Sequence, residues 1–193
     1  MPGIYSFVPL SRNRIDDAEF VFNDCGDASK CWCSYWYRSN AEYKAGWGEG
    51  NRRFFRSLVR KGPPPGIIAY RDGEPAGWCG VAPRQGFDRL NRSKPFAAVD
   101  EMDVWSVNCF VVTKKQRRKG LLRLLLREAV TYADHQGAKC IEGYPVDRQV
   151  KPGWGSAELF PGTFSAFRGE GFVEVVRRLP ARPLVRKILN STD

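Results

Sequence analysis

The spacing of apolar residues along the chain predicts a protein that mixes strands with helices. Residues 4–8 and 104–112 are short runs rich in valine and aromatic side chains, as is typical of strands. Residues 49–60 repeat apolar side chains at helical spacing. Ser11 is placed to cap a polar helix that ends near Phe22. The chain is therefore not a repeat of one type of element.

Turn-forming residues separate these elements. The Gly-Pro-Pro-Pro-Gly segment at 62–66 ends the helix before it. Asp-Gly at 72–73 lies between the apolar runs 67–70 and 76–81, which predicts a β-hairpin. Residues 84–101 are polar, and we expect them to form a surface loop.

The segment after the strand at 104–112 carries the most informative pattern. A basic, glycine-containing turn at 116–121 leads into a helix whose apolar residues repeat on one face, from Leu122 to Ala133. A short strand at 139–144 follows, so the pattern predicts a right-handed crossover between parallel strands. Unpaired N–H groups and the helix dipole make such a helix N-terminus an anion site. Basic turns before helices are common, however, and one glycine is a weaker signal than three.

Charge supports a localised anion site. The 193 residues correspond to one domain, and 42% are hydrophobic, which excludes a wholly disordered chain. The formal net charge is +10, yet 12 of the 31 basic residues lie in two segments without acidic residues, 114–127 and 177–187. The remaining positions are nearly neutral. The pattern therefore favours one or two concentrated cationic sites over a uniformly basic surface.

Other patterns limit the location and the chemistry. We expect a cytoplasmic protein without a membrane span, because no secretory signal or long apolar run is visible. The six cysteines are then expected to be reduced thiols. His135 is the only histidine, which excludes mechanisms that need two. Cys31 and Cys33 lack the spacing of a zinc ribbon, so we expect no metal.

Two motifs carry a resemblance to a known family. Val112-Thr-Lys-Lys-Gln-Arg-Arg-Lys-Gly120-Leu-Leu122 resembles the cofactor motif of the GNAT superfamily of acetyl-CoA-dependent N-acetyltransferases, and Phe167 with the Gly-Phe pair at 171–172 resembles its C-terminal motif. The resemblance covers roughly residues 45–180. It implies a single α/β (α+β) domain with a mixed, mostly antiparallel sheet flanked by helices. We expect residues 45–193 to form this core and 1–44 to be an extension packed on it.

The resemblance also implies residues that bind acetyl-CoA, the expected co-substrate. The strand residues Phe110, Val111 and Val112 are expected to pair with the pantetheine arm, and the turn to place its backbone N–H groups around the pyrophosphate. The turn residues assigned to this role are Arg117, Arg118, Lys119, Gly120, Leu121, Leu122 and Arg123. Leu122 departs from the family pattern, which has Gly or Ala there, so the turn must tilt or widen.

The catalytic groups are less directly implied. Phe167 stands where the family often has a tyrosine that protonates the leaving thiolate, so Tyr144, Ser165 or Thr163 must substitute if a donor is needed. On an alternating strand Glu142 and Tyr144 share one face, and we predict them as general base and general acid. The alternative is a solvated Glu142 and a core Tyr144. Asp103 and Glu101 are second choices for the base, and a backbone N–H near Val111 is expected to hold the oxyanion.

The acceptor is the most open part of the prediction. We expect acetyl transfer to a primary amine of a small molecule, by direct attack in a ternary complex, with a homodimer as one possible assembly. The alternatives are a protein, peptide or aminoacyl-tRNA acetyltransferase, and a non-catalytic nucleic-acid module. Aromatic residues crowd segment 23–48, either as a wall for a flat or cationic amine or as a packed cover over the sheet. Trp154 is a hypothetical gate for the substrate. Whether residues 31–37 form a strand or a loop stays open.

Overall fold

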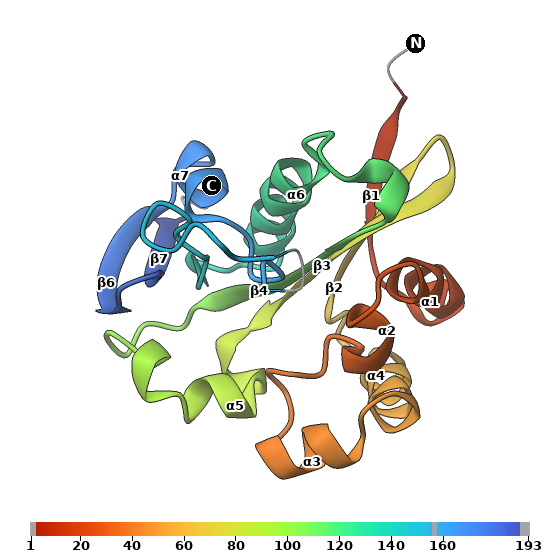
Figure 1. Ribbon diagram of the computed structural model, residues 1–193, viewed down its shortest axis with the longest axis horizontal. Coiled ribbons are helices and arrows are strands. Elements are labelled where there is room, and N and C mark those ends of the chain that lie inside the picture. The colour runs from red at the N-terminus through yellow and green to blue at the C-terminus, as the bar shows by residue number, and fades with distance from the viewer. Residues whose placement is uncertain (1–2, 156–157, 190–193) are drawn as a thin grey trace.

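A seven-stranded sheet organises the chain, in the order β1-β2-β3-β4-β5-β7-β6 (Figure 1). The computed structural model describes residues 3–155 and 158–189. The strands are β1 (Tyr5–Pro9), β2 (Gly66–Arg71), β3 (Glu74–Pro83), β4 (Trp105–Val112), β5 (Cys140–Gly143), β6 (Val173–Leu179) and β7 (Arg182–Ile188). Neighbouring strands are antiparallel except β4 and β5, which pair in parallel. This confirms the predicted mixed sheet, its hairpin and its parallel crossover.

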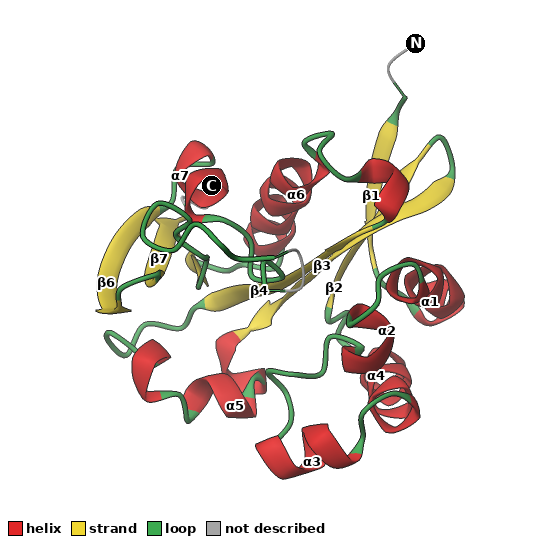
Figure 2. Cartoon of the chain, viewed as in Figure 1, coloured by secondary structure: helices red, strands yellow, loops and turns green. Residues whose placement is uncertain are grey.

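Helices cover both faces of the sheet (Figure 2). They are α1 (Ile15–Asn23), α2 (Ala28–Cys31), α3 (Asn40–Ala45), α4 (Glu49–Lys61), α5 (Asp88–Asn91), α6 (Leu121–His135) and α7 (Phe164–Gly169). The apolar stripe of α6 packs on one face, while α1 and α4 bury their apolar residues against the other. None of the described helices is long and apolar enough to cross a membrane.

The N-terminal segment takes part in the sheet. β1 pairs with β2 over five residues, and α1 packs beside β3. Ser11 lies at the start of a short 3₁₀ turn before α1, without a side-chain cap. The division of the chain into an extension (1–44) and a core (45–193) stays a prediction. β1, which belongs to the extension, is nevertheless an edge strand of the same sheet.

Two segments differ from a simple interpretation of their polarity. Residues 31–37 do not form a strand: Cys31 ends α2, and residues 32–37 form a packed loop. The expected surface loop at 84–101 is wrong: it contains α5 and two 3₁₀ turns, and it buries Phe87, Leu90 and Phe96 against Trp36. Most of its polar residues face solvent, although Arg84 is buried, and the three buried apolar side chains are too widely spaced to be recognised as a core face.

The sheet opens beside β4, and this opening creates the space for a site. Pairing between β4 and β5 covers three residue pairs and ends at Val107 and Gly143. β4 continues to Val112 with only β3 beside it, after an irregularity where Gly80 pairs with Cys109 and Val81 with Val107. The second half of β4 therefore has one edge that no strand of the described chain covers.

Candidate active site

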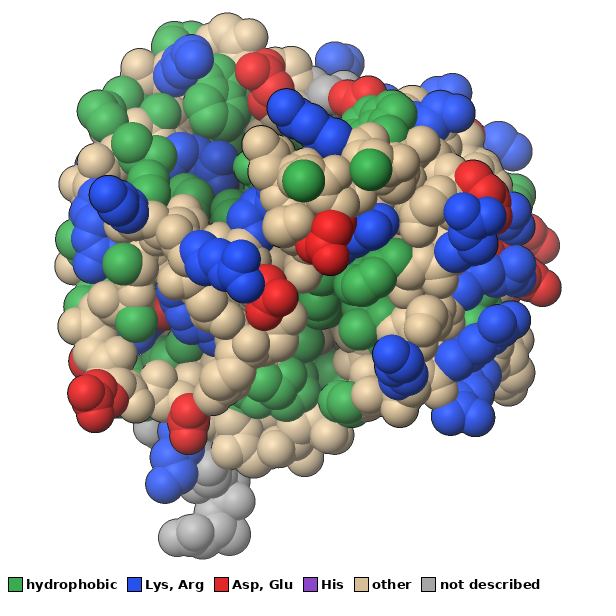
Figure 3. Space-filling model, turned by 90° about the horizontal axis from the view of Figure 1, so that it is seen from below, with side chains coloured by type: hydrophobic (Ala, Val, Ile, Leu, Met, Phe, Trp, Pro, Cys, Tyr) green, Lys and Arg blue, Asp and Glu red, His purple; other side chains and the backbone are tan. Residues whose placement is uncertain are grey.

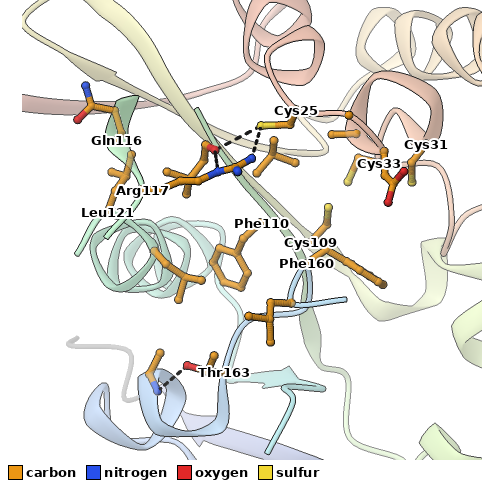
Figure 4. Close-up of a pocket in the computed structure, with 18 of the residues that line it drawn as sticks. Cys25, Cys31, Cys33, Cys109, Phe110, Gln116, Arg117, Leu121, Phe160 and Thr163 are labelled. Carbon is orange, nitrogen blue, oxygen red and sulfur yellow. Dashed lines mark hydrogen bonds between the residues drawn. The ribbon is translucent and has the colours of Figure 1, made fainter. Parts of the chain in front are cut away.

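A cavity of about 1030 Å³ lies along this uncovered edge of β4. It is bounded by α2 and the loop after it, by β4, by the N-terminus of α6, and by the segment that leads into α7 (Figure 4). Seen from one face of the molecule, hydrophobic side chains gather in a hollow flanked by lysine and arginine side chains (Figure 3). The cavity thus has a basic end at α6 and an aromatic, thiol-rich end at α2 and α3.

The basic end is built from backbone as much as from side chains. Arg118 and Gly120 have φ angles of 61° and 81°, and this left-handed turn sets the start of α6. No backbone or side-chain oxygen of the described chain accepts from the N–H groups of residues 118–122. Five unpaired donors in sequence, at the positive end of a 15-residue helix, have the geometry that suits a phosphate group.

Most of the predicted cofactor residues meet at this cavity. Nine of the ten line it, and Lys119 is the exception. The side chain of Arg123 is already engaged within the protein. Its guanidinium is ion-paired with Glu170 at 3.1 Å and donates a hydrogen bond to the Gly169 carbonyl at 3.3 Å. Leu122 lies half-buried in the first turn of α6, so the departure from the family pattern leaves the helix start intact. The role of these residues in binding stays a prediction.

The edge of β4 is already engaged by other parts of the chain. The N–H of Phe110 donates to the carbonyl of Phe160 at 2.6 Å. The carbonyl of Val112 accepts from Arg117 Nε and from the Cys25 thiol, each at 3.3 Å. A ligand that pairs with Phe110 as an added strand must therefore displace Phe160.

Thiols gather at the other end of the cavity. Cys31, Cys33 and Cys109 line it together (Figure 4). The hydrogen bond that the Cys109 thiol donates to Cys33, together with burial, holds the pKa of Cys109 well above its ordinary value. Burial raises the pKa of Cys31 as well. No group of three or more His, Cys, Asp or Glu residues within 3–155 and 158–189 is arranged to hold a metal ion. With their pKa values raised, the thiols of Cys31 and Cys109 are protonated at neutral pH.

Aromatic rings form the wall beyond the thiols. Tyr35 packs edge-on against Tyr43 at 5.4 Å between ring centroids, and Tyr43 against Trp47 at 5.5 Å. Phe160 extends this row of rings, with 6.0 Å between its ring centroid and that of Tyr35. In contrast, Trp32 and Trp78 pack in the core beside α1. The aromatic segment is thus divided: part of it covers the sheet and part of it lines the cavity.

Glu142 and Tyr144 lie together, as their alternation predicts, but away from the cavity. Both are fully buried and hydrogen-bonded to each other, and neither lines the cavity. The Glu142 carboxylate is ion-paired with Arg84 and, at 2.9 Å, with Arg186. Burial raises the pKa of Tyr144 well above its ordinary value. Because this carboxylate is engaged by two guanidinium groups and lies outside the cavity, the structure argues against Glu142 as the base, and that role stays a prediction.

The remaining sequence predictions also lie outside the cavity. Asp103 accepts from Gln85 Nε2 at 2.6 Å, and Glu101 is exposed. Trp154 packs beside Lys151 at 5.2 Å, so its role as a gate stays a hypothesis. The hydroxyl groups of Thr163 and Ser165, in contrast, line the cavity 3.3 Å from each other. Because Thr163 caps α7, this pair is held where the helix begins.

The second basic segment, 177–187, is a structural feature and not an open anion site. Arg177 binds Glu174 and Asp147, and Arg178 donates to the Ala97 carbonyl at 2.6 Å. The other three basic residues have the following partners: Arg182 the carbonyl of Tyr144, Arg186 the carboxylates of Glu142 and Asp100, and Lys187 the carbonyl of Glu170. Each guanidinium or ammonium group therefore joins the last hairpin to a neighbouring loop.

This fold and this cavity define a class of protein, and comparison with protein families agrees. Residues 28–148 of the chain match the family model "Acetyltransferase (GNAT) family". The match covers more than half of the chain, which therefore belongs to the GNAT acetyltransferase family. No curated protein sequence is significantly similar to the chain.

Solved structures share the fold at low sequence identity. A GNAT-family acetyltransferase from Streptococcus agalactiae is 13% identical with a TM-score of 0.59, and the match covers 96% of each chain. PaiA N-acetyltransferase from Thermoplasma acidophilum, crystallised with coenzyme A, is 14% identical with a TM-score of 0.55, covering 96% and 99% of the two chains. N-acetylglutamate synthase from Neisseria gonorrhoeae is 11% identical with a TM-score of 0.54, covering 98% of this chain and 36% of that one. At such identities the likeness concerns the fold alone.

Proposed function

We propose that the protein transfers the acetyl group of acetyl-CoA to a primary amine of a small molecule. The observation that carries this proposal is the row of unpaired N–H groups at residues 118–122, which opens onto the cavity beside β4. A pyrophosphate satisfies such a row, and Arg117 and Arg118 add charge beside it. Two structures of similar fold hold coenzyme A, which supports the same cofactor in this cavity.

The amine approaches from the opposite end of the cavity, where aromatic and thiol side chains form the wall. The β4 edge lies between the two ends, so a thioester on an extended pantetheine arm reaches the amine there. A small molecule is favoured because the acceptor end is lined by packed side chains of α2, α3 and the loop between them. A nucleic-acid module is disfavoured, since the 177–187 side chains are paired within the chain.

Thermal unfolding with acetyl-CoA tests the cofactor assignment. At about 100 times its dissociation constant, acetyl-CoA is expected to stabilise the fold by about 2.7 kcal/mol, which raises the melting temperature by several degrees at this chain length. The measurement is differential scanning fluorimetry with acetyl-CoA, with free adenosine as the control. Absence of a shift at millimolar acetyl-CoA contradicts the proposal.

Ser165 is the proton donor that the cavity offers to the leaving thiolate. Its hydroxyl lines the cavity, whereas the phenyl ring of Phe167 is buried and has no proton to donate. A CoA thiolate is a tolerable leaving group because a thiol has a pKa of about 8.5. We therefore expect Ser165→Ala to lower kcat by only about tenfold, below the range of about 100-fold or more for an essential general acid. The same change should leave the dissociation constant for acetyl-CoA unaltered in calorimetry.

A further inference from the structure

The acceptor end of the cavity has no group suited to remove a proton from an ammonium ion. Asp27 is the one carboxylate among the described lining residues, and no histidine lines the cavity. Asp27 is exposed and lies two residues from Cys25, whose thiol contacts Arg117 at the basic end. His135 is exposed at the far end of α6. The cavity therefore resembles an acyl-transfer site without a built-in base.

The other titratable groups of this end are proton donors and not acceptors. The thiols of Cys31 and Cys109 hold their protons at neutral pH, for the reasons given above. The phenol of Tyr43 is likewise neutral, because burial and its contact with Cys31 raise its pKa. An amine that must lose a proton before attack finds no acceptor among these side chains.

Positive charge behind the aromatic wall works against a cationic acceptor. The Arg89 guanidinium stacks 4.1 Å from the centre of the Tyr35 ring and 5.2 Å from that of Tyr43. It is held there because its Nε donates to the carbonyl of Arg38 at 3.0 Å. An arginine on a ring uses the electron-rich π system that would otherwise attract an ammonium group. The rings then present a flat apolar surface and not a cation trap.

From these three features we infer that the acceptor is a weakly basic amine borne by an aromatic ring, which enters the cavity uncharged. This rests on the proposed function and specifies its substrate class. The ring stacks on the wall formed by Tyr35, Tyr43 and Trp47, in place of the ion pair that an alkylammonium ion needs. The amine lone pair forms the C–N bond to the thioester carbonyl and the C–S bond breaks. The Ser165 hydroxyl gives its proton to the thiolate and takes up the N–H proton that the nitrogen loses. Atoms and charges balance without an external base.

Matched amines test the inference. With acetyl-CoA we expect kcat/KM at pH 7 to be at least tenfold higher for 4-methylaniline, an uncharged ring amine, than for 4-methylbenzylamine, which has the same ring and an alkylammonium group. Hexylamine, without a ring, should be poorer still. Between pH 7 and 9 the rate with 4-methylaniline should stay constant, whereas that with 4-methylbenzylamine should rise as its amine loses its proton.

Variants locate the recognition in the wall. Trp47 is 49% exposed at the rim of the cavity, and Trp47→Ala should raise KM for 4-methylaniline about tenfold, the upper range for one aromatic contact. Phe20→Ala is the matched control, because Phe20 is 56% exposed on α1 and does not line the cavity. Asp27→Asn should leave kcat/KM for 4-methylaniline unchanged. A loss of tenfold or more in that variant makes Asp27 the base and overturns the inference.

The outcomes separate this inference from the proposed function. Suppose that acetyl-CoA raises the melting temperature, but 4-methylaniline is no better an acceptor than the two alkyl amines, or none of the three is acetylated. The substrate class is then wrong, and the cofactor assignment stands. If acetyl-CoA fails to bind, the proposed function itself is wrong. Turnover in the expected order, with the expected pH profiles, supports both.

Discussion

Glu142→Gln is expected to destabilise the fold by about 3–5 kcal/mol, the cost typical of removing one partner from a buried ion pair. Glu142 is fully buried, and its carboxylate is the only acceptor shared by Arg84, Arg186 and Tyr144 among the described residues. A neutral amide cannot balance two buried guanidinium groups. For a chain of this length, the melting temperature should fall by about 10 °C.

The expected loss of stability is large because the ion-pair network around Glu142 connects several elements of the fold. Arg84 follows β3, Glu142 lies on β5 and Arg186 on β7, and Arg186 also binds Asp100 at 2.6 Å. The four charges cancel, so the network joins three strands and the 84–101 segment with no net charge, and the exposed Asp100 balances one of the two buried arginines. Removing the central carboxylate leaves both arginines partly unpaired.

Glu101→Gln is the matched control, because Glu101 is exposed and was an alternative base in the sequence analysis. It should change the melting temperature by less than about 1 °C. The measurement is thermal unfolding of both variants followed by circular dichroism. If Glu142→Gln keeps the native melting temperature and loses turnover, Glu142 acts as the catalytic base and the structural role is wrong.

Gly120→Asp is expected to weaken acetyl-CoA binding about 100-fold. A carboxylate placed about 5 Å from a pyrophosphate oxygen costs about 3 kcal/mol at an effective dielectric constant of about 20, which corresponds to that factor. Gly120 has a φ of 81°, and no atom lies within 4 Å of an added Cβ. The new side chain therefore has room beside the proposed phosphate site without contact with the protein.

Gly120→Asn isolates the charge from the backbone effect. Asn and Asp are similar in size and are the residues best tolerated in left-handed conformation after glycine. We expect Asn to weaken binding only severalfold, as measured by calorimetry with acetyl-CoA. Equal affinities for the two variants would mean that the start of α6 does not face the phosphates.

Strong local periodicity is what made most of the fold predictable. Valine-rich β4 and the apolar stripe of α6 each signal their element within a dozen residues, and Asp-Gly at 72–73 fixes the hairpin. The 84–101 segment lacked such a signal, because Phe87, Leu90 and Phe96 are buried by contacts with Trp36 and Tyr144 that are distant in sequence. Local pattern does not report that kind of burial.

The site was predictable in one half only. The basic turn before α6 carries its own chemistry, since a helix start and its charges are adjacent in sequence. Alternation correctly placed Glu142 and Tyr144 together, yet it cannot tell which face of a strand meets a cavity and which meets buried arginines. Arg186 donates a hydrogen bond to Asp100, which lies 86 residues away in the sequence. Charge counting indicated one or two cationic sites, and it could not show that the 177–187 side chains are paired within the chain.

The contact between Phe110 and Phe160 has a consequence for the protein without its cofactor. An uncovered strand edge in the middle of a sheet is a template for pairing with other chains, and so a route to aggregation. With the Phe110 N–H bound to the Phe160 carbonyl at 2.6 Å, and the Asn108 carbonyl accepting from the Trp36 indole at 3.3 Å, the edge is capped from within. These two contacts protect the uncovered edge of β4 against self-association.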